Sequence, residues 1–139
     1  MLFIDTWGWI VLYNRREPRH SELRALYREL SEDERTAYTT DYVLDETITL
    51  LFRRVPVSQA CRALQLLNKA VQEGYLCLEY ITPERFSRAK DLRVTLQDKP
   101  QISFTDLTTM VVMEELRLKR ILTQDQHFAQ VGMGFNLVP

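Results

Sequence analysis

The sequence predicts a three-layer α/β/α fold with a mainly parallel central sheet of about five strands. Short apolar runs alternate with longer segments of helical periodicity along the chain. This alternation is typical of parallel sheets, because each parallel strand needs a crossover helix to reach the next one. Four Gly and five Pro are too few for a turn-rich all-β protein. The 139 residues fit a single domain over 1–139.

The predicted elements follow from apolar runs, periodicity and end signals. Leu2 to Ile4 is an apolar run ended by Asp5, which indicates a buried strand. Pro56 and Gly74 mark the start and stop of one helix, and Thr82 with Pro83 opens another. Helices are expected from 6 to about 13, over 20–31, 41–54 and 57–73, from 82 onward, and from 103 to about 119. A helical turn is expected at 125–130. Further strands are expected at 36–40, 75–81, 120–123 and 135–138.

The composition and charge of the chain argue against several classes of protein. The net charge of −1 argues against a generic coat for polyanions. Fourteen of the 18 basic residues are Arg, whose planar guanidinium suits phosphate contacts, although solvated helix faces also explain most of them. No apolar run approaches the roughly 20 residues that span a bilayer, and the N-terminus lacks a secretory signal. Cys61 and Cys77 form no disulfide framework and are expected to be reduced core residues, which favours a cytoplasmic location.

Two acids fall at the ends of predicted strands. Asp5 ends the first strand and Asp125 closely follows the strand at 120–123. An open parallel sheet places its functional crevice at the carboxyl ends of the strands, so both acids are expected at that edge. The alternative is that each simply caps the helix that follows it.

Asp106 and Glu46 are carried by predicted helices. Ser103 to Asp106 matches a capping box, in which the acid reaches back to the amide of the capping residue, so capping alone could explain Asp106. Glu46 lies three residues after Val43 and four before Leu50, at or beside the buried face, where a carboxylate needs a cation or a donor. An Arg partner or a metal ion would satisfy it. Asp45 lies about 100° round the helix and is the less favoured acid.

Several carboxylates in one place indicate a site for divalent metal. Phosphodiesters are anionic, so acids can act on them only with a cation between. Mg²⁺ and Mn²⁺ prefer oxygen ligands, and two such ions about 3.5–4 Å apart activate water and stabilise the leaving oxygen. Zinc is disfavoured because the thiols are dispersed and His20 and His127 lack ligand-like spacing. The sequence has no glycine-rich phosphate loop or nucleophile elbow.

The chain resembles the PIN-domain family, and in particular the small VapC-like ribonucleases of toxin–antitoxin systems. The resemblance spans nearly the whole chain and is carried by four stretches in order: Leu2-Phe3-Ile4-Asp5-Thr6, Thr39-Thr40-Asp41-Tyr42-Val43-Leu44-Asp45-Glu46, Ser103-Phe104-Thr105-Asp106 and Leu122-Thr123-Gln124-Asp125-Gln126-His127-Phe128. It implies a metal-dependent endoribonuclease that binds Mg²⁺ or Mn²⁺, forms homodimers and is silenced by an antitoxin peptide.

The resemblance also implies roles for particular residues. Asp5 and Asp106 would be the central metal ligands, with Glu46 and Asp125 completing the catalytic acidic pocket. Hydroxyls that could orient a ligand are expected from Thr6, Ser103 and Thr123. Two departures leave the number of metal ions open: Trp7 stands where relatives often have a small polar residue, and His127 stands where some relatives have a further acid.

Contacts to the RNA backbone are expected from a basic loop. Arg15, Arg16 and Arg19 follow the first predicted helix and are the candidate RNA-binding residues, with simple solvation as the alternative.

Two other functions compete with the nuclease. A catalytically weak PIN domain could serve as an RNA- or protein-binding module, although such a protein would be free to lose its acids. A receiver-like phosphoacceptor domain also gathers acids at strand ends. It would normally have paired acids early in the chain and a lysine after a late strand, and Asp5 stands alone while 123–125 lacks that lysine.

Overall fold

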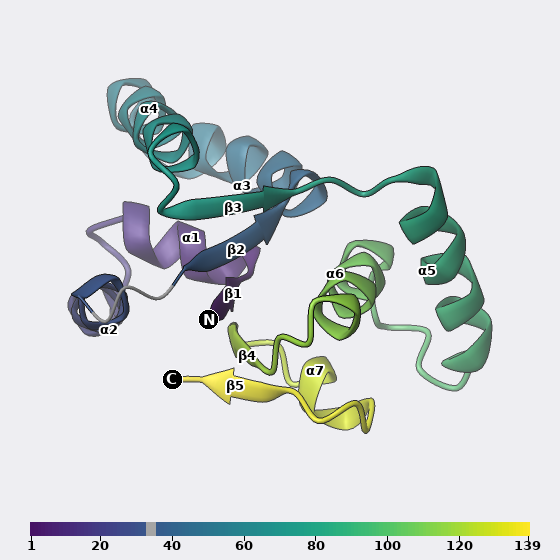
Figure 1. Ribbon diagram of the computed structural model, residues 1–139. Coiled ribbons are helices and arrows are strands. Elements are labelled where there is room, and N and C mark those ends of the chain that lie inside the picture. Colours follow the sequence, from purple (N-terminus) through teal and green to yellow (C-terminus); the bar gives the residue numbers. More distant parts are fainter. Residues whose placement is uncertain (33–35) are drawn as a thin grey trace.

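A computed structural model describes residues 1–32 and 36–139 of the protein (Figure 1). The described residues contain one sheet of five parallel strands in the order β3-β2-β1-β4-β5. Helices flank this sheet, so the predicted α/β/α fold is confirmed. The strands are β1 (Leu2–Ile4), β2 (Ala37–Thr40), β3 (Leu76–Glu79), β4 (Arg120–Leu122) and β5 (Asn136–Val138).

The helices begin and end close to the predicted positions. Thr40 and Thr82 each accept a backbone N–H in the first turn of the helix that follows, through Oγ1. Gly74 has a positive φ of 82° just beyond the end of α4, as a helix stop requires. The helices are α1 (Thr6–Tyr13), α2 (His20–Glu32), α3 (Asp41–Arg54), α4 (Val57–Gln72), α5 (Pro83–Thr95), α6 (Phe104–Glu115) and α7 (His127–Gln130).

The end of α6 differs from the prediction. The helix stops at Glu115 and not near residue 119. The backbone N–H of Leu118 bonds the carbonyl of Met113, and that of Arg117 bonds the carbonyl of Glu114, which is the Schellman pattern. Arg117 takes the left-handed conformation, with φ 57°. Since glycine usually fills that position, the sequence carried no stop signal there.

The strand order places the sheet's crevice between β1 and β4. From β1 the chain builds outward through β2 to β3 on one side, and β4 and β5 then extend the sheet on the other. The carboxyl ends of β1 and β4 therefore flank the point where the order reverses, where open sheets bind ligands. A receiver domain has the order 2-1-3-4-5, so this topology rules out the receiver alternative.

The core joins the sheet to α1 and α6. Phe3 and Ile4 of β1 and Met110 and Val112 of α6 are fully buried in one cluster. Gly8 lets α1 lie close to the sheet, because a Cβ there would come within 3.0 Å of Ile4 and Leu122 side-chain atoms. Figure 1 shows α5 outside α6, at the periphery.

Two smaller expectations concern the cysteines and the membrane. Both cysteines are free, as predicted, but Cys61 is exposed and Cys77 only half-buried, so their assignment to the core was wrong. Cys61 lies on the solvent side of the amphipathic helix α4. No helix within the described ranges is long and apolar enough to cross a bilayer.

Candidate metal centre

All four carboxylates singled out in the sequence line one open pocket at the crevice. Asp5 directly follows β1, and Asp125 comes from the segment after β4. Glu46 comes from the second turn of α3, and Asp106 from the first turn of α6. The pocket is completed by Thr6, Trp7, Gln101, Ser103, Thr123 and Gln124. Residues from both ends of the chain therefore meet where the topology places a ligand site.

Asp5 is held by a hydroxyl from β4's carboxyl end. Asp5 is 6% exposed, and its Oδ2 accepts a 2.8 Å hydrogen bond from Oγ1 of Thr123. Asp5 occupies the N-cap position of α1, but its side chain makes no capping hydrogen bond, so capping does not explain it. Burial is the main cause that raises the pKa of Asp5 to about 6. The negative charges of Glu46 and Asp125 add to this, and hydrogen bonds from Thr123 and the Thr6 amide oppose it.

Glu46 is oriented by a hydroxyl from α1. Oγ1 of Thr6 lies 3.1 Å from Oε2 of Glu46 as a hydrogen-bond donor and 3.4 Å from the carbonyl of Val43. Among the described residues, the ion pairs include no Arg partner for Glu46, so the expected arginine alternative lacks support. Glu46 is half-buried, whereas Asp45 is exposed. Of the two neighbouring acids, Glu46 is the one that faces the pocket.

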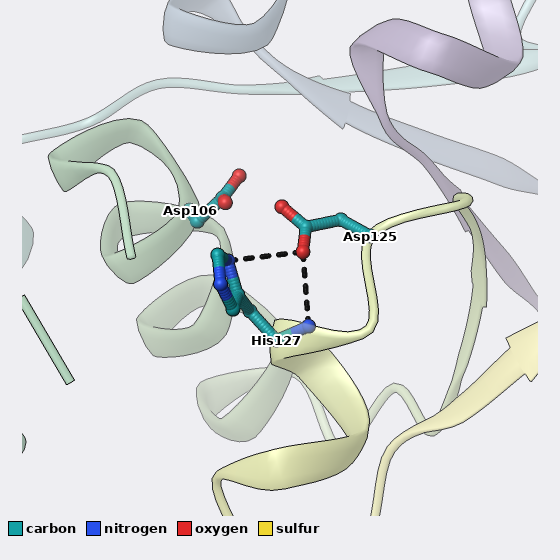
Figure 2. A group of neighbouring side chains, drawn as sticks. All are labelled: Asp106, Asp125 and His127. Atoms are coloured by element: carbon teal, nitrogen blue, oxygen red, sulfur yellow. Dashed lines mark hydrogen bonds and ion pairs between the residues drawn. The ribbon is translucent and has the colours of Figure 1, made fainter. Parts of the chain in front are cut away.

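Asp106 forms one of the two hydrogen bonds of the expected capping box. Its backbone N–H donates to Oγ of Ser103 at 3.1 Å, which caps α6. Asp106 is 8% exposed, and its carboxylate points toward Asp125 (Figure 2). Burial is again the largest cause that raises the pKa of Asp106, to about 8, followed by the charge of Asp5 and the close contact with Asp125. The capping role and a place in the pocket therefore coexist.

The fourth motif adds a histidine to the acids. Oδ1 of Asp125 accepts the backbone N–H of His127 at 2.9 Å, so the capping alternative describes Asp125 in part. Nδ1 of His127 lies 3.0 Å from the same oxygen. One atom from each of Asp106, Asp125 and His127 lies within 4.8 Å of the others, and Figure 2 shows the three side chains gathered there. From the sequence, His127 was weighed only as a ligand of zinc, and the Asp-x-His sequence was the signal that could have placed it beside Asp125.

The donor set fits a divalent cation. Carboxylate oxygens are the ligands that Mg²⁺ and Mn²⁺ prefer. Like charges raise the pKa of both Asp5 and Asp106, so the four acids repel one another in the protein alone. A divalent cation among them reverses this repulsion and favours the ionised carboxylates. Asp5, Asp106, Glu46 and Asp125 would be the residues that hold it.

Comparison with known proteins gives the family. The model of the PIN domain matches residues 2–133, nearly the whole chain. The chain belongs to the PIN domain family. The resemblance to this family that the four motifs indicated is therefore confirmed.

Two relatives of this PIN domain and two solved structures are informative. The 23S rRNA-specific endonuclease VapC20 of Mycobacterium tuberculosis is 28% identical over 132 residues, which cover 95% of each chain. A VapC ribonuclease of Archaeoglobus fulgidus is 27% identical over 133 residues, covering 94% of this chain and 81% of that one. The crystal structure of VapC20, described as a sarcin-ricin loop cleaving toxin, has a TM-score of 0.75 at 25% identity over 95% of both chains. VapBC2 from Rickettsia felis, bound to a DNA fragment from their promoter, shares the fold with a TM-score of 0.74 at 15% identity, over 99% of this chain and 98% of that one.

The three candidate RNA-binding arginines lie in different settings. Arg19 pairs with Glu22 at 2.9 Å, and its guanidinium lies 5.7 Å from the ring centre of Trp7, a wall of the acidic pocket. Arg16 is exposed, and Arg15 lines another groove. Of the three arginines, Arg19 therefore lies at the rim of the acidic pocket. The role of Arg15, Arg16 and Arg19 in binding RNA stays a prediction.

A second groove of about 540 Å³ lies between α1, α2 and α4. Its apolar wall includes Trp9, Leu12, Tyr13, Ala63 and Leu66. Its basic side chains are Arg15, Arg24, Arg28 and Arg62. This α1–α2–α4 groove therefore suits an acidic segment that also carries apolar side chains.

Proposed function

We propose that the protein is a metal-dependent endoribonuclease that hydrolyses RNA phosphodiester bonds with Mg²⁺ or Mn²⁺. The observation that carries the proposal is the convergence of Asp5, Glu46, Asp106 and Asp125 on one open pocket at the switch point of the sheet. The relatives named as VapC ribonucleases support it. The proposal treats residues 1–139 as one PIN domain and places its action on RNA in the cytoplasm.

Each acidic side chain has a defined task in this proposal. Asp5 and Asp106, the most buried pair, bind the cation, and Glu46 and Asp125 complete its surroundings. When bound, the cation supplies a Lewis acid that polarises the phosphodiester and lowers the pKa of water. Attack of water in line with the leaving oxygen gives a 5′-phosphate and a 3′-hydroxyl. The carboxylates thus act as ligands and not as nucleophiles.

The hydroxyls keep those ligands in place. Thr123 holds Asp5, and Thr6 holds Glu46, through the side-chain hydrogen bonds described above. Ser103 acts one step further away, since it fixes the backbone of Asp106 and not its carboxylate. Partners of this kind orient metal ligands, and their loss costs about 10–100-fold in metal affinity or activity.

The substrate backbone would cross the rim of the pocket near Trp7. Trp7 is half-buried and Arg19 lies over its ring, so an RNA segment that passes there would meet an aromatic side chain and a charge for its phosphates. Arg16 is exposed nearby in the chain and can extend the contact. We include Arg15, Arg16 and Arg19 as backbone contacts in the proposal.

We further propose that the protein is the toxin of a toxin–antitoxin pair and that an antitoxin segment occupies the α1–α2–α4 groove. The apolar wall and the basic side chains of the groove support an occupant with acidic and apolar residues. We expect Arg24→Glu with Arg28→Glu to abolish co-purification of the antitoxin from co-expressing cells and to leave RNA cutting intact. Arg53→Glu, on exposed α3 surface, is the matched control. An antitoxin that still co-purifies with the double variant would reject this groove.

A homodimer completes the proposed assembly. Exposed apolar side chains such as Phe86 and Val94 on the peripheral helix α5 are available for a second copy. Sedimentation velocity of the purified protein tests this point, and a monomer at micromolar concentration would contradict it.

The nuclease itself is tested with a mixed RNA pool, with and without Mn²⁺. We expect cutting that depends on the metal and is lost in Asp5→Asn and in Asp106→Asn. Asp45→Asn is the matched control, because this exposed acid neighbours Glu46 on α3 but does not line the pocket. Cutting that survives EDTA, or that persists in both variants, would reject the site. RNA binding without cutting would favour a binding module instead.

A further inference from the structure

His127 lies beside two of the four acids, Asp106 and Asp125. It is the first residue of α7, and its ring stands next to the carboxylates of Asp106 and Asp125 (Figure 2). One donor atom from each of these three residues lies within 4.8 Å of the other two. The arrangement therefore contains a nitrogen donor as well as oxygen donors.

The ring nitrogen that faces the acids lacks a hydrogen bond. Within the described part of the chain, Nδ1 of His127 is a buried atom with no hydrogen-bond partner. Oδ1 of Asp125 lies 3.0 Å away, within ion-pair distance, but it forms no hydrogen bond with this nitrogen. A buried polar atom without a partner costs free energy, and such atoms in native proteins call for an explanation. A cation would provide one.

The spacing of the two donor atoms suits neighbouring positions around one ion. Adjacent ligands of an octahedral ion with bonds of about 2.1 Å lie about 3.0 Å apart. The distance between Nδ1 of His127 and Oδ1 of Asp125 has this value. Asp106 faces Asp125 across the same space, so it can supply a further oxygen.

We propose that His127 is a nitrogen ligand of the divalent ion held by Asp106 and Asp125, and that it makes the centre select Mn²⁺ over Mg²⁺. This inference rests on the metal centre proposed above. Mg²⁺ is a hard ion that takes oxygen ligands and keeps its waters. An imidazole favours first-row transition ions, and the carboxylates around it still suit Mn²⁺.

Pulsed EPR with Mn²⁺ as the only added metal tests the nitrogen ligand directly. We expect the bound Mn²⁺ of the wild-type protein to show coupling to a ¹⁴N nucleus, and His127→Asn to lose it. His20→Asn is the matched control, because His20 lies in the α1–α2–α4 groove, and it must keep the signal. The wild-type and His20→Asn spectra decide the question even where His127→Asn folds poorly.

Competition between ions tests the selectivity. Free Mn²⁺ is titrated against each protein by EPR with increasing Mg²⁺. We expect the preference for Mn²⁺ over Mg²⁺ to fall at least about tenfold in His127→Asn. Loss of a residue that only hydrogen-bonds a metal ligand already costs about 10–100-fold in metal affinity or activity. Bound Mn²⁺ without nitrogen coupling, or an unchanged preference in the variant, would overturn the role of His127 and leave the nuclease standing. Wild-type protein that binds no Mn²⁺ would overturn both proposals.

Discussion

Thr123 donates its hydroxyl hydrogen to Oδ2 of Asp5 over 2.8 Å, although the two residues lie near opposite ends of the chain. The same hydroxyl oxygen accepts the backbone N–H of Asp125 at 3.1 Å. One side chain at the end of β4 thus sets the position of two acids on either side of the switch point. This arrangement ties the central strand pair to the proposed chemistry.

The first prediction concerns this hydroxyl. Thr123→Val keeps the shape of the side chain and removes the donor, so Asp5 loses its orientation. We expect the affinity for Mn²⁺ and the rate of RNA cutting to fall about 10–100-fold. Thr123→Ser should restore most of both quantities, because it returns the hydroxyl. Calorimetric titration with Mn²⁺ measures the affinity, and a Val variant with full affinity would contradict the account.

The second prediction concerns pH. The pKa values of Asp5 and Asp106 rise from 3.8 to about 6 and about 8, so the metal-free folded protein keeps protons that the unfolded chain has released. These two groups therefore lower stability as pH rises from about 4 to about 8, and their effect is constant above that.

Asp106→Asn isolates this effect because it removes one of the two ionisable groups with little change in shape. In EDTA we expect the variant to melt at a higher temperature than wild type at pH 8, with the difference shrinking toward pH 4. Differential scanning calorimetry at several pH values measures it. Asp45→Asn should show no such pH-dependent gain, and a variant less stable than wild type at pH 8 would count against the crowded carboxylates.

The third prediction concerns the loop before α6. Arg93 donates to the carbonyls of Ile102, Leu96 and Lys99, each at 2.7 Å, and so holds the segment that leads to the cap of α6. Arg93→Met should lower the free energy of unfolding by about 1.5–3 kcal/mol, the range for hydrogen bonds from charged groups. Urea unfolding measures the loss. Arg88→Met, an exposed neighbour on α5, is the control, and equal losses in the two variants would contradict the role of Arg93.

The fourth prediction concerns RNA binding at the rim. In an Asp106→Asn background that cannot cut, Arg19→Gln should weaken RNA binding and reduce the salt dependence of log Kd by about one phosphate contact. Glu22→Gln should not weaken binding, since it frees Arg19 from its ion pair. Fluorescence anisotropy at several salt concentrations gives the Kd for RNA and its dependence on salt. An unchanged salt slope in Arg19→Gln would remove this arginine from the interface.

The sequence predicted most of the fold because local signals were strong. Thr40, Gly74 and Thr82 act at helix ends as their chemistry suggests. The end of α6 was missed because Arg117 occupies a conformation that glycine usually takes, so no local signal marked it. Cys61 was misplaced because free cysteines are usually buried, whereas this one follows the buried Ala60 and lies on the exposed side of α4.

The candidate site was predicted less evenly. The acids could be chosen because strand ends meet at one edge of a parallel sheet. Their partners could not be paired from sequence alone, since Thr123 and Asp5 meet only through the order of the strands. The place of His127 beside Asp106 could not be predicted either, because it depends on how α7 packs against the start of α6.

Anomalous diffraction from crystals grown with MnCl₂, recorded at the manganese edge, tests the central claim most directly. The account predicts a peak in the pocket within bonding distance of Asp5 or Asp106 and adjacent to Asp125. It also predicts that the peak disappears in Asp106→Asn crystals grown in the same way. Fully ionised, well-ordered acids around a pocket with no manganese peak, or a peak confined to another surface, would contradict a metal-dependent site.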